Sequence, residues 1–73
     1  MAIYQNTSKK RLQHMNRLSY ECAFLPGERV RVIETTPEHV YVHCIDYCGN
    51  YRAYEHAYIE RTVFDNSFTK VAN

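Results

Sequence analysis

The sequence has no tryptophan, few glycines and prolines, and no long apolar run. Its 73 residues leave room for one domain, 1–73. No apolar run approaches the roughly 20 residues that a membrane-spanning helix needs, so we expect no transmembrane segment. The three cysteines are an odd number, and the opening MAIYQNTSKK has no apolar stretch typical of a secretory signal. We therefore expect a cytoplasmic protein with reduced thiols and no disulfide framework.

Patterns that carry catalysis or metal binding are also missing. The chain has no glycine-rich phosphate loop, and so small a domain has little depth from which to exclude water. His39 and His43 would lie about 13 Å apart on a strand, at about 3.3 Å per residue. Cys44 and Cys48 leave a four-ligand zinc site incomplete. We therefore predict neither an enzyme nor a metal or cofactor site, and a pair of ligands from His43 and His56 stays the open alternative.

Charge is distributed unevenly along the chain, although the net charge is only +1. Residues 1–24 hold four basic residues and one acidic residue, a net charge of +3. The remaining residues hold five basic and seven acidic residues, a net charge of −2. This layout favours one oriented contact over general binding to polyanions.

The first third of the chain has the spacing of an amphipathic helix. Leu12, Met15 and Leu18 recur at three-residue steps and would form a narrow apolar face. Thr7 or Ser8 can cap the free N–H groups at the start. We therefore predict a basic helix over residues 8–20, within an N-terminal arm and helix of residues 1–24.

Beyond Pro26 and Gly27 the spacing of apolar residues changes from that of a helix to every second residue, as in a strand. We predict an antiparallel sheet over residues 28–64, with a first strand at 29–33 and two strands at 39–47 and 51–59. Residues 61–64 would add a short last strand, and residues 65–73 would form a C-terminal tail. The predicted fold class is α+β, with a basic amphipathic N-terminal helix followed by a small antiparallel β-meander.

The hairpin turn fixes the register of the two longer strands. Gly49 and Asn50 suit a two-residue type II′ turn, which pairs Cys48 with Tyr51 and His43 with His56. A slip of one residue would exchange the two faces. One face then holds small apolar side chains, from Val40, Val42, Cys44, Ala53, Ala57 and Ile59. The other holds mostly aromatic and polar ones, from Tyr41, His43, Ile45, Tyr47, Arg52, Tyr54, His56 and Tyr58.

Three functional hypotheses follow, and none involves catalysis. The first is a regulator that binds a larger protein through its N-terminal segment, with Ile3, Tyr4, Lys9, Lys10, Arg11, His14 and Arg17 as contact residues. The alternative is a single-stranded nucleic-acid-binding module whose bases stack on a Tyr-rich sheet face, with Tyr41, Arg52, Tyr54 and Tyr58 as contact residues. The third is a toxin-like or inhibitor-like protein directed at another host enzyme.

Two resemblances make the first hypothesis more specific. The segment Gly27-Glu28-Arg29-Val30-Arg31-Val32 resembles the opening strand of SH3-like barrels, including those of transcription and translation factors. The whole chain, with a charged N-terminal segment before Tyr-rich strands, resembles the small RNA polymerase inhibitors and antiterminators of Xanthomonas phages. This resemblance implies a monomer in the host bacterial cytoplasm that binds the β′ subunit of bacterial RNA polymerase. It would inhibit initiation by displacing the σ factor, promote terminator read-through, and contact nascent RNA.

Overall fold

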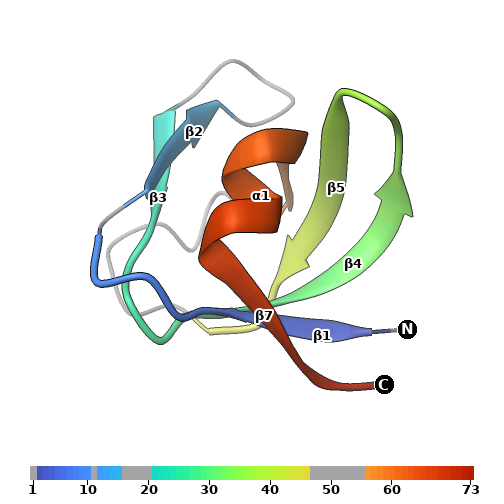
Figure 1. Cartoon of the computed structure of the whole chain (residues 1–73). Helices are drawn as coiled ribbons and strands as arrows, with labels where there is room; N and C mark the ends of the chain where they lie inside the picture. Colours follow the sequence, from blue (N-terminus) through green and yellow to red (C-terminus); the bar gives the residue numbers. More distant parts are fainter. Residues whose placement is uncertain (1, 11, 16–20, 47–55) are drawn as a thin grey trace.

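The computed structural model describes residues 2–10, 12–15, 21–46 and 56–73. Its elements are β1 (Ile3–Asn6), β2 (Leu12–Met15), β3 (Glu21–Phe24), β4 (Arg29–Thr35), β5 (His39–Cys44), β6 (His56–Glu60), α1 (Arg61–Ser67) and β7 (Phe68–Ala72). Strands β1 and β4 to β7 form one antiparallel sheet in the order β6-β5-β4-β1-β7, and β2 pairs with β3. Helix α1 lies inside the curve of the sheet and packs against β5, β6 and β7 (Figure 1).

The core fills the concave side of the sheet. Alternate residues of β4, β5 and β6 point into it, as the two-residue period of a strand requires. Phe68 closes the core from β7, stacking on Phe64 at 5.1 Å and meeting Phe24 edge-on at 5.8 Å between ring centroids. Burial of each large apolar side chain contributes about 1.5–3 kcal/mol. The core residues are Phe24, Val30, Val40, Val42, Cys44, Ala57, Ile59, Phe64 and Phe68.

Residues 2–10, 12–15 and 21–24, the described part of the N-terminal third, are not helical, so the predicted α+β class is wrong and the fold is mainly β. Residues 3–6 form β1, which lies between β4 and β7 rather than on a free arm. Residues 12–15 pair with residues 21–24 as a two-stranded ribbon. The hydroxyls expected to cap a helix are engaged elsewhere, because Thr7 Oγ1 forms a hydrogen bond with Thr69 Oγ1 and Ser8 Oγ donates to Asn6 Oδ1. The backbone N–H groups of Thr7 and Ser8 also donate to the Ser67 carbonyl. Contacts distant in sequence therefore override the local helical spacing.

Asn6 holds this unexpected path in place. Its side chain is 1% exposed. Its Nδ2 donates to the carbonyls of Lys10 and Phe24, each at 3.1 Å. Its Oδ1 accepts from the N–H and the hydroxyl of Ser8 at 3.1 and 2.6 Å. One buried amide thus turns the chain after β1 and ties that turn to the end of β3.

The C-terminal segment also differs from the prediction. Residues 61–64 belong to α1 rather than to a strand, with an ion pair between Arg61 and Asp65 at 3.3 Å. The expected tail of residues 65–73 contains the end of α1 and the whole of β7, which pairs with β1. Phe64 and Phe68 explain the difference, because a helical turn between them brings both rings into the core. Within the described residues, no helix is both long and apolar enough to cross a membrane.

The register of the meander is confirmed where the structure describes it. His43 pairs with His56, Tyr41 with Tyr58, and Val40 with Ile59. The small apolar side chains of these strands face the core, as predicted. The Gly49-Asn50 turn lies outside the described residues. In β4 the register shifts between Val32 and Glu34, so that Glu34 lies opposite Tyr41.

Candidate functional site

The convex side of β4, β5 and β6 carries the chemistry that the core does not use, and we call it the outer face. Since neighbouring strand residues point to opposite sides, the residues between the buried valines point outward. Cross-strand pairing arranges the outward residues in rows. The first row is Arg31, His43 and His56, the second is Glu34, Tyr41 and Tyr58, and the third is His39 and Glu60.

Aromatic rings run continuously along the outer face and form what we call the ring ladder. His43 and His56 stack at 4.7 Å between centroids, with 1° between their planes. Tyr41 stacks on His56 at 5.7 Å and on Tyr58 at 4.8 Å. His39 meets Tyr58 edge-on at 6.3 Å. A hydrogen bond of 2.9 Å between the Tyr41 hydroxyl and Nδ1 of His56 fixes the middle of the ladder. Cross-strand ring pairs of this kind stabilise a sheet and present a preformed surface.

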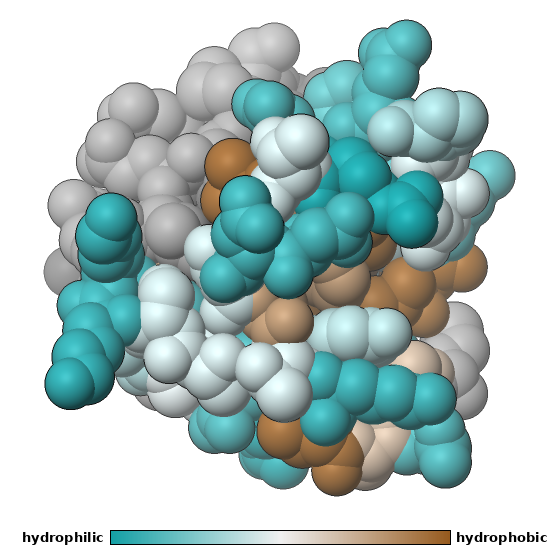
Figure 2. All heavy atoms as spheres, in the orientation of Figure 1, coloured by the Kyte–Doolittle hydropathy of each residue, from teal (hydrophilic) through white to brown (hydrophobic). Residues whose placement is uncertain are grey.

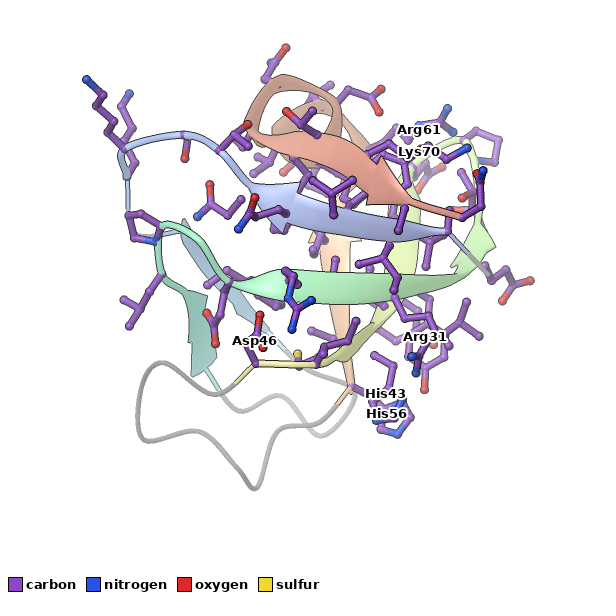
Figure 3. The ribbon with its side chains drawn as sticks, turned by 90° about the horizontal axis from the view of Figure 1, so that it is seen from below. Arg31, His43, Asp46, His56, Arg61 and Lys70 are labelled. Atoms are coloured by element: carbon purple, nitrogen blue, oxygen red, sulfur yellow. The ribbon has the colours of Figure 1, made fainter. Side chains whose placement is uncertain are left out.

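Charge divides the outer face into two ends. Arg31 stands with the two histidines of the first row, whereas Glu34 and Glu60 lie in the other rows. Among the described residues Arg31 has no ion-pair partner. Figure 3 shows its side chain beside His43 and His56, away from Arg61 and Lys70. The ladder therefore joins a basic end to an acidic end.

Asp46, which follows β5, is already engaged by Arg29. Asp46 accepts from Nε of Arg29 at 2.8 Å, from its second guanidinium nitrogen at 3.1 Å and from its backbone N–H at 3.1 Å. These hydrogen bonds hold the pKa of the Asp46 carboxyl below its usual range and raise the pKa of Arg29. Asp46 therefore leaves the charge of Arg31 uncompensated.

The histidine pair is not arranged to share a metal ion. A metal lies in the plane of each imidazole that binds it, because the nitrogen lone pair lies in that plane. The planes of His43 and His56 are parallel and separated, so no point lies in both. Nowhere in residues 2–10, 12–15, 21–46 and 56–73 do three or more potential metal ligands gather. As placed, the two rings form a stacking surface.

The structure separates the residues predicted to bind a protein partner. Tyr4 packs on Phe64 at 4.9 Å between centroids, and Ile3 is half-buried in β1, so both belong to the fold. Lys9 and Lys10 are exposed. His14 lies in β2. Arg11 and Arg17 lie outside the described residues.

Lys9 and Lys10 form a basic turn whose backbone is fixed. The Lys10 carbonyl accepts from Asn6 Nδ2 at 3.1 Å and from the Ser8 hydroxyl at 3.4 Å. The buried Asn6 thus presents two lysines on a rigid bend. Among the predicted contact residues whose side chains the structure describes, Lys9 and Lys10 are the exposed ones.

Two residues predicted for the nucleic-acid alternative meet in the ring ladder. Tyr41 and Tyr58 are stacked neighbours, and Tyr58 is 39% exposed. Arg52 and Tyr54 lie outside the described residues. The site prediction omitted Arg31 and the three histidines of the outer face. Their signal was present in the sequence, because the predicted register already paired His43 with His56.

A shallow pocket adjoins the acidic end of the outer face. It has a volume of about 400 Å³ and lies where the β4–β5 turn meets the start of α1. Arg61 closes one wall, donating to the Thr36 carbonyl at 3.1 Å from its guanidinium. The pocket extends the outer face past Glu60. Its lining residues are Pro37, Glu38, His39, Glu60, Arg61 and Thr62.

No family model matches the chain, and no curated protein or solved structure is significantly similar to it. The function is therefore argued from the geometry of the outer face. Figure 2 shows the side of the molecule that carries α1 and β7, where hydrophobic side chains form small patches among hydrophilic ones.

Proposed function

We propose that the protein is a small regulator without catalytic activity, which binds a larger protein through the outer face of β4, β5 and β6. The observation that carries this proposal is the ring ladder with a basic end and an acidic end. Aromatic residues in a polar, charged rim are characteristic of protein interfaces. Because the rings already hold one another, little side-chain freedom is lost on binding.

The charge pattern favours a protein over a nucleic acid as the partner. A nucleic acid presents negative phosphates along its whole length, and its affinity comes largely from neutralising them. Glu34 and Glu60 would repel the phosphates of a nucleic-acid strand that followed the ring ladder from Arg31 onward. A protein surface can instead offer an acidic group at one end and a basic group at the other. Such complementarity fixes orientation and speeds encounter.

The resemblance to phage-encoded inhibitors of RNA polymerase is the basis on which we propose a specific partner. Under this proposal the protein binds bacterial RNA polymerase at its β′ subunit, displaces the σ factor during initiation and promotes terminator read-through. A regulator without an active site acts by exclusion or by binding one state of its target more tightly than another. The basic turn at Lys9 and Lys10 would add long-range attraction to an acidic enzyme surface.

Single-stranded nucleic-acid binding is the second candidate, and the Tyr41–Tyr58 stack favours it. Bases stack on aromatic rings with little sequence preference, and each contact is worth about 1–3 kcal/mol. Arg31 could accompany the stacked bases as a phosphate contact. On this reading the acidic end of the outer face would lie outside the path of the strand.

Capture from a bacterial lysate separates the two candidates. Tagged protein is incubated with lysate, with and without nuclease, and the retained proteins are identified by mass spectrometry. We expect RNA polymerase subunits to be retained in both samples. Recovery of nucleic acid without polymerase, lost after nuclease treatment, would contradict the regulator and support the second candidate. Retention of a different host protein would preserve protein binding but reject polymerase as the partner.

A further inference from the structure

We propose that Arg31, His43 and His56 form a carboxylate-binding subsite that recognises an acidic side chain on the protein partner. This inference rests on the proposed protein-binding function and specifies the chemistry of the partner. The same geometry requires a basic group on the partner, facing Glu60 in the third row. The recognised surface is therefore one with an acidic and a basic group at a fixed separation.

The subsite has the donors that a carboxylate needs. Arg31 offers a planar fork of N–H groups that matches two carboxylate oxygens. Cross-strand pairing brings His43 beside Arg31, and His56 beside His43, on the same side of the sheet. Figure 3 shows the three side chains gathered at one place. No described carboxylate is paired with Arg31, since Asp46 is held by Arg29.

The rest of the outer face indicates what accompanies the carboxylate. Tyr41 and Tyr58 lie next to the subsite and provide ring faces for an apolar or aromatic side chain. Glu60 pairs with His39, which lies four residues from His43 along β5. At about 3.3 Å per residue, that places the basic group of the partner about 13 Å from its carboxylate. A second anionic group there would meet Glu60 and the neighbouring Glu34.

The charge of the first row also favours a carboxylate over a phosphate as the ligand. Arg31 is the permanent cation of the row, and the imidazoles add charge only when protonated. A single carboxylate is matched by one guanidinium near neutral pH, whereas a phosphate group has about twice that charge. Glu34 in the adjacent row adds repulsion that grows with the charge of the ligand.

The test uses the full chain, with acetate and inorganic phosphate as probes. Each anion is titrated at constant ionic strength, and NMR follows the Nε–H of Arg31 and the ring protons of His43 and His56. We expect saturable shifts at these groups with acetate. Arg31→Gln is expected to weaken acetate binding about fivefold or more.

Arg61→Gln is the matched control, because Arg61 is already engaged by the Thr36 carbonyl and by Asp65. It should leave the acetate shifts of the first row unchanged. If acetate moved the NMR signals of Arg31 and Arg61 equally and without saturation, the proposed subsite would be overturned. Phosphate affinity about tenfold above that of acetate at pH 7.5 would overturn the carboxylate assignment and favour a phosphate ligand. If the chain bound acetate but did not capture polymerase from the lysate, the subsite would stand and polymerase would be rejected as the partner. If it captured polymerase but did not bind acetate at these residues, the subsite alone would be rejected.

Discussion

Replacement of Asn6 by alanine tests the feature that separates this fold from the expected N-terminal helix. The Asn6 amide is buried and joins the end of β1 to Ser8, Lys10 and Phe24 through four hydrogen bonds. Alanine keeps the backbone of β1 and removes all of these bonds. The substitution therefore perturbs the turn without deleting any apolar contact of the core.

The expected loss is large for so small a domain. Each hydrogen bond contributes about 0.5–1.5 kcal/mol net, and a buried group left without a partner costs about 1–3 kcal/mol. The Phe24 carbonyl loses a buried bond, whereas the groups of Ser8 and Lys10 are more accessible to water. We therefore expect Asn6→Ala to lower the free energy of unfolding by about 3 kcal/mol. A domain of this size has about 4–11 kcal/mol in total.

Urea unfolding followed by circular dichroism measures this loss. Asn66→Ala is the matched control, because Asn66 is exposed on α1, and we expect a change of less than about 0.5 kcal/mol there. Asn6→Asp keeps the acceptor atoms and removes the amide donor, so its loss should be large as well. A loss below about 1 kcal/mol for Asn6→Ala, equal to that of the control, would refute the role of Asn6 as the anchor of the turn.

Three further predictions concern stability. Deletion of residues 2–6 should abolish the cooperative unfolding transition, because β1 lies between β4 and β7; a truncated chain that still unfolds cooperatively would show that this segment is an arm after all. Gly27→Ala should cost about 1–2 kcal/mol in urea unfolding, since Gly27 has a φ of 89° and no atom lies near the added methyl group; no loss would contradict this backbone conformation. Asp46→Asn should lower the melting temperature slightly at about pH 6 and much less at about pH 2.5. The low pKa of Asp46 gives stability that is present above about pH 4 and lost as the pH falls through the folded value, so an equal difference at both pH values would contradict the Arg29 pairing.

The meander was predictable because its information is local. Alternation along residues 39–44 and 56–60 identifies the buried side, and the register predicted from a two-residue turn at Gly49-Asn50 agrees with the observed pairing of these residues. The same register placed Tyr41, Tyr58 and both paired histidines on one face. Half of the candidate site therefore followed from a single turn assignment.

The N-terminal third was not predictable by the same reasoning. Leu12 and Met15 fit a helical face, yet their segment pairs with residues 21–24. What decides their conformation is Asn6 and the Ser67 carbonyl, which is about sixty residues away in sequence. The spacing of apolar residues and the presence of capping residues contain no information about hydrogen-bond partners so distant in sequence. The charge pattern along the outer face escaped prediction for a related reason, since the bulge in β4 sets which residues lie opposite Tyr41.

The affinity of two double variants for bacterial RNA polymerase holoenzyme tests the central claim most directly. Tyr41→Thr with Tyr58→Thr removes the two tyrosine rings of the ring ladder and keeps residues that favour strands. Lys9→Ser with Lys10→Ser removes the basic turn. After circular dichroism confirms that both variants fold, we predict that the first weakens binding about tenfold or more and the second less than about threefold at physiological salt. Full affinity in the tyrosine variant, with loss in the lysine variant, would contradict the outer face as the binding surface and assign the contact to the N-terminal turn.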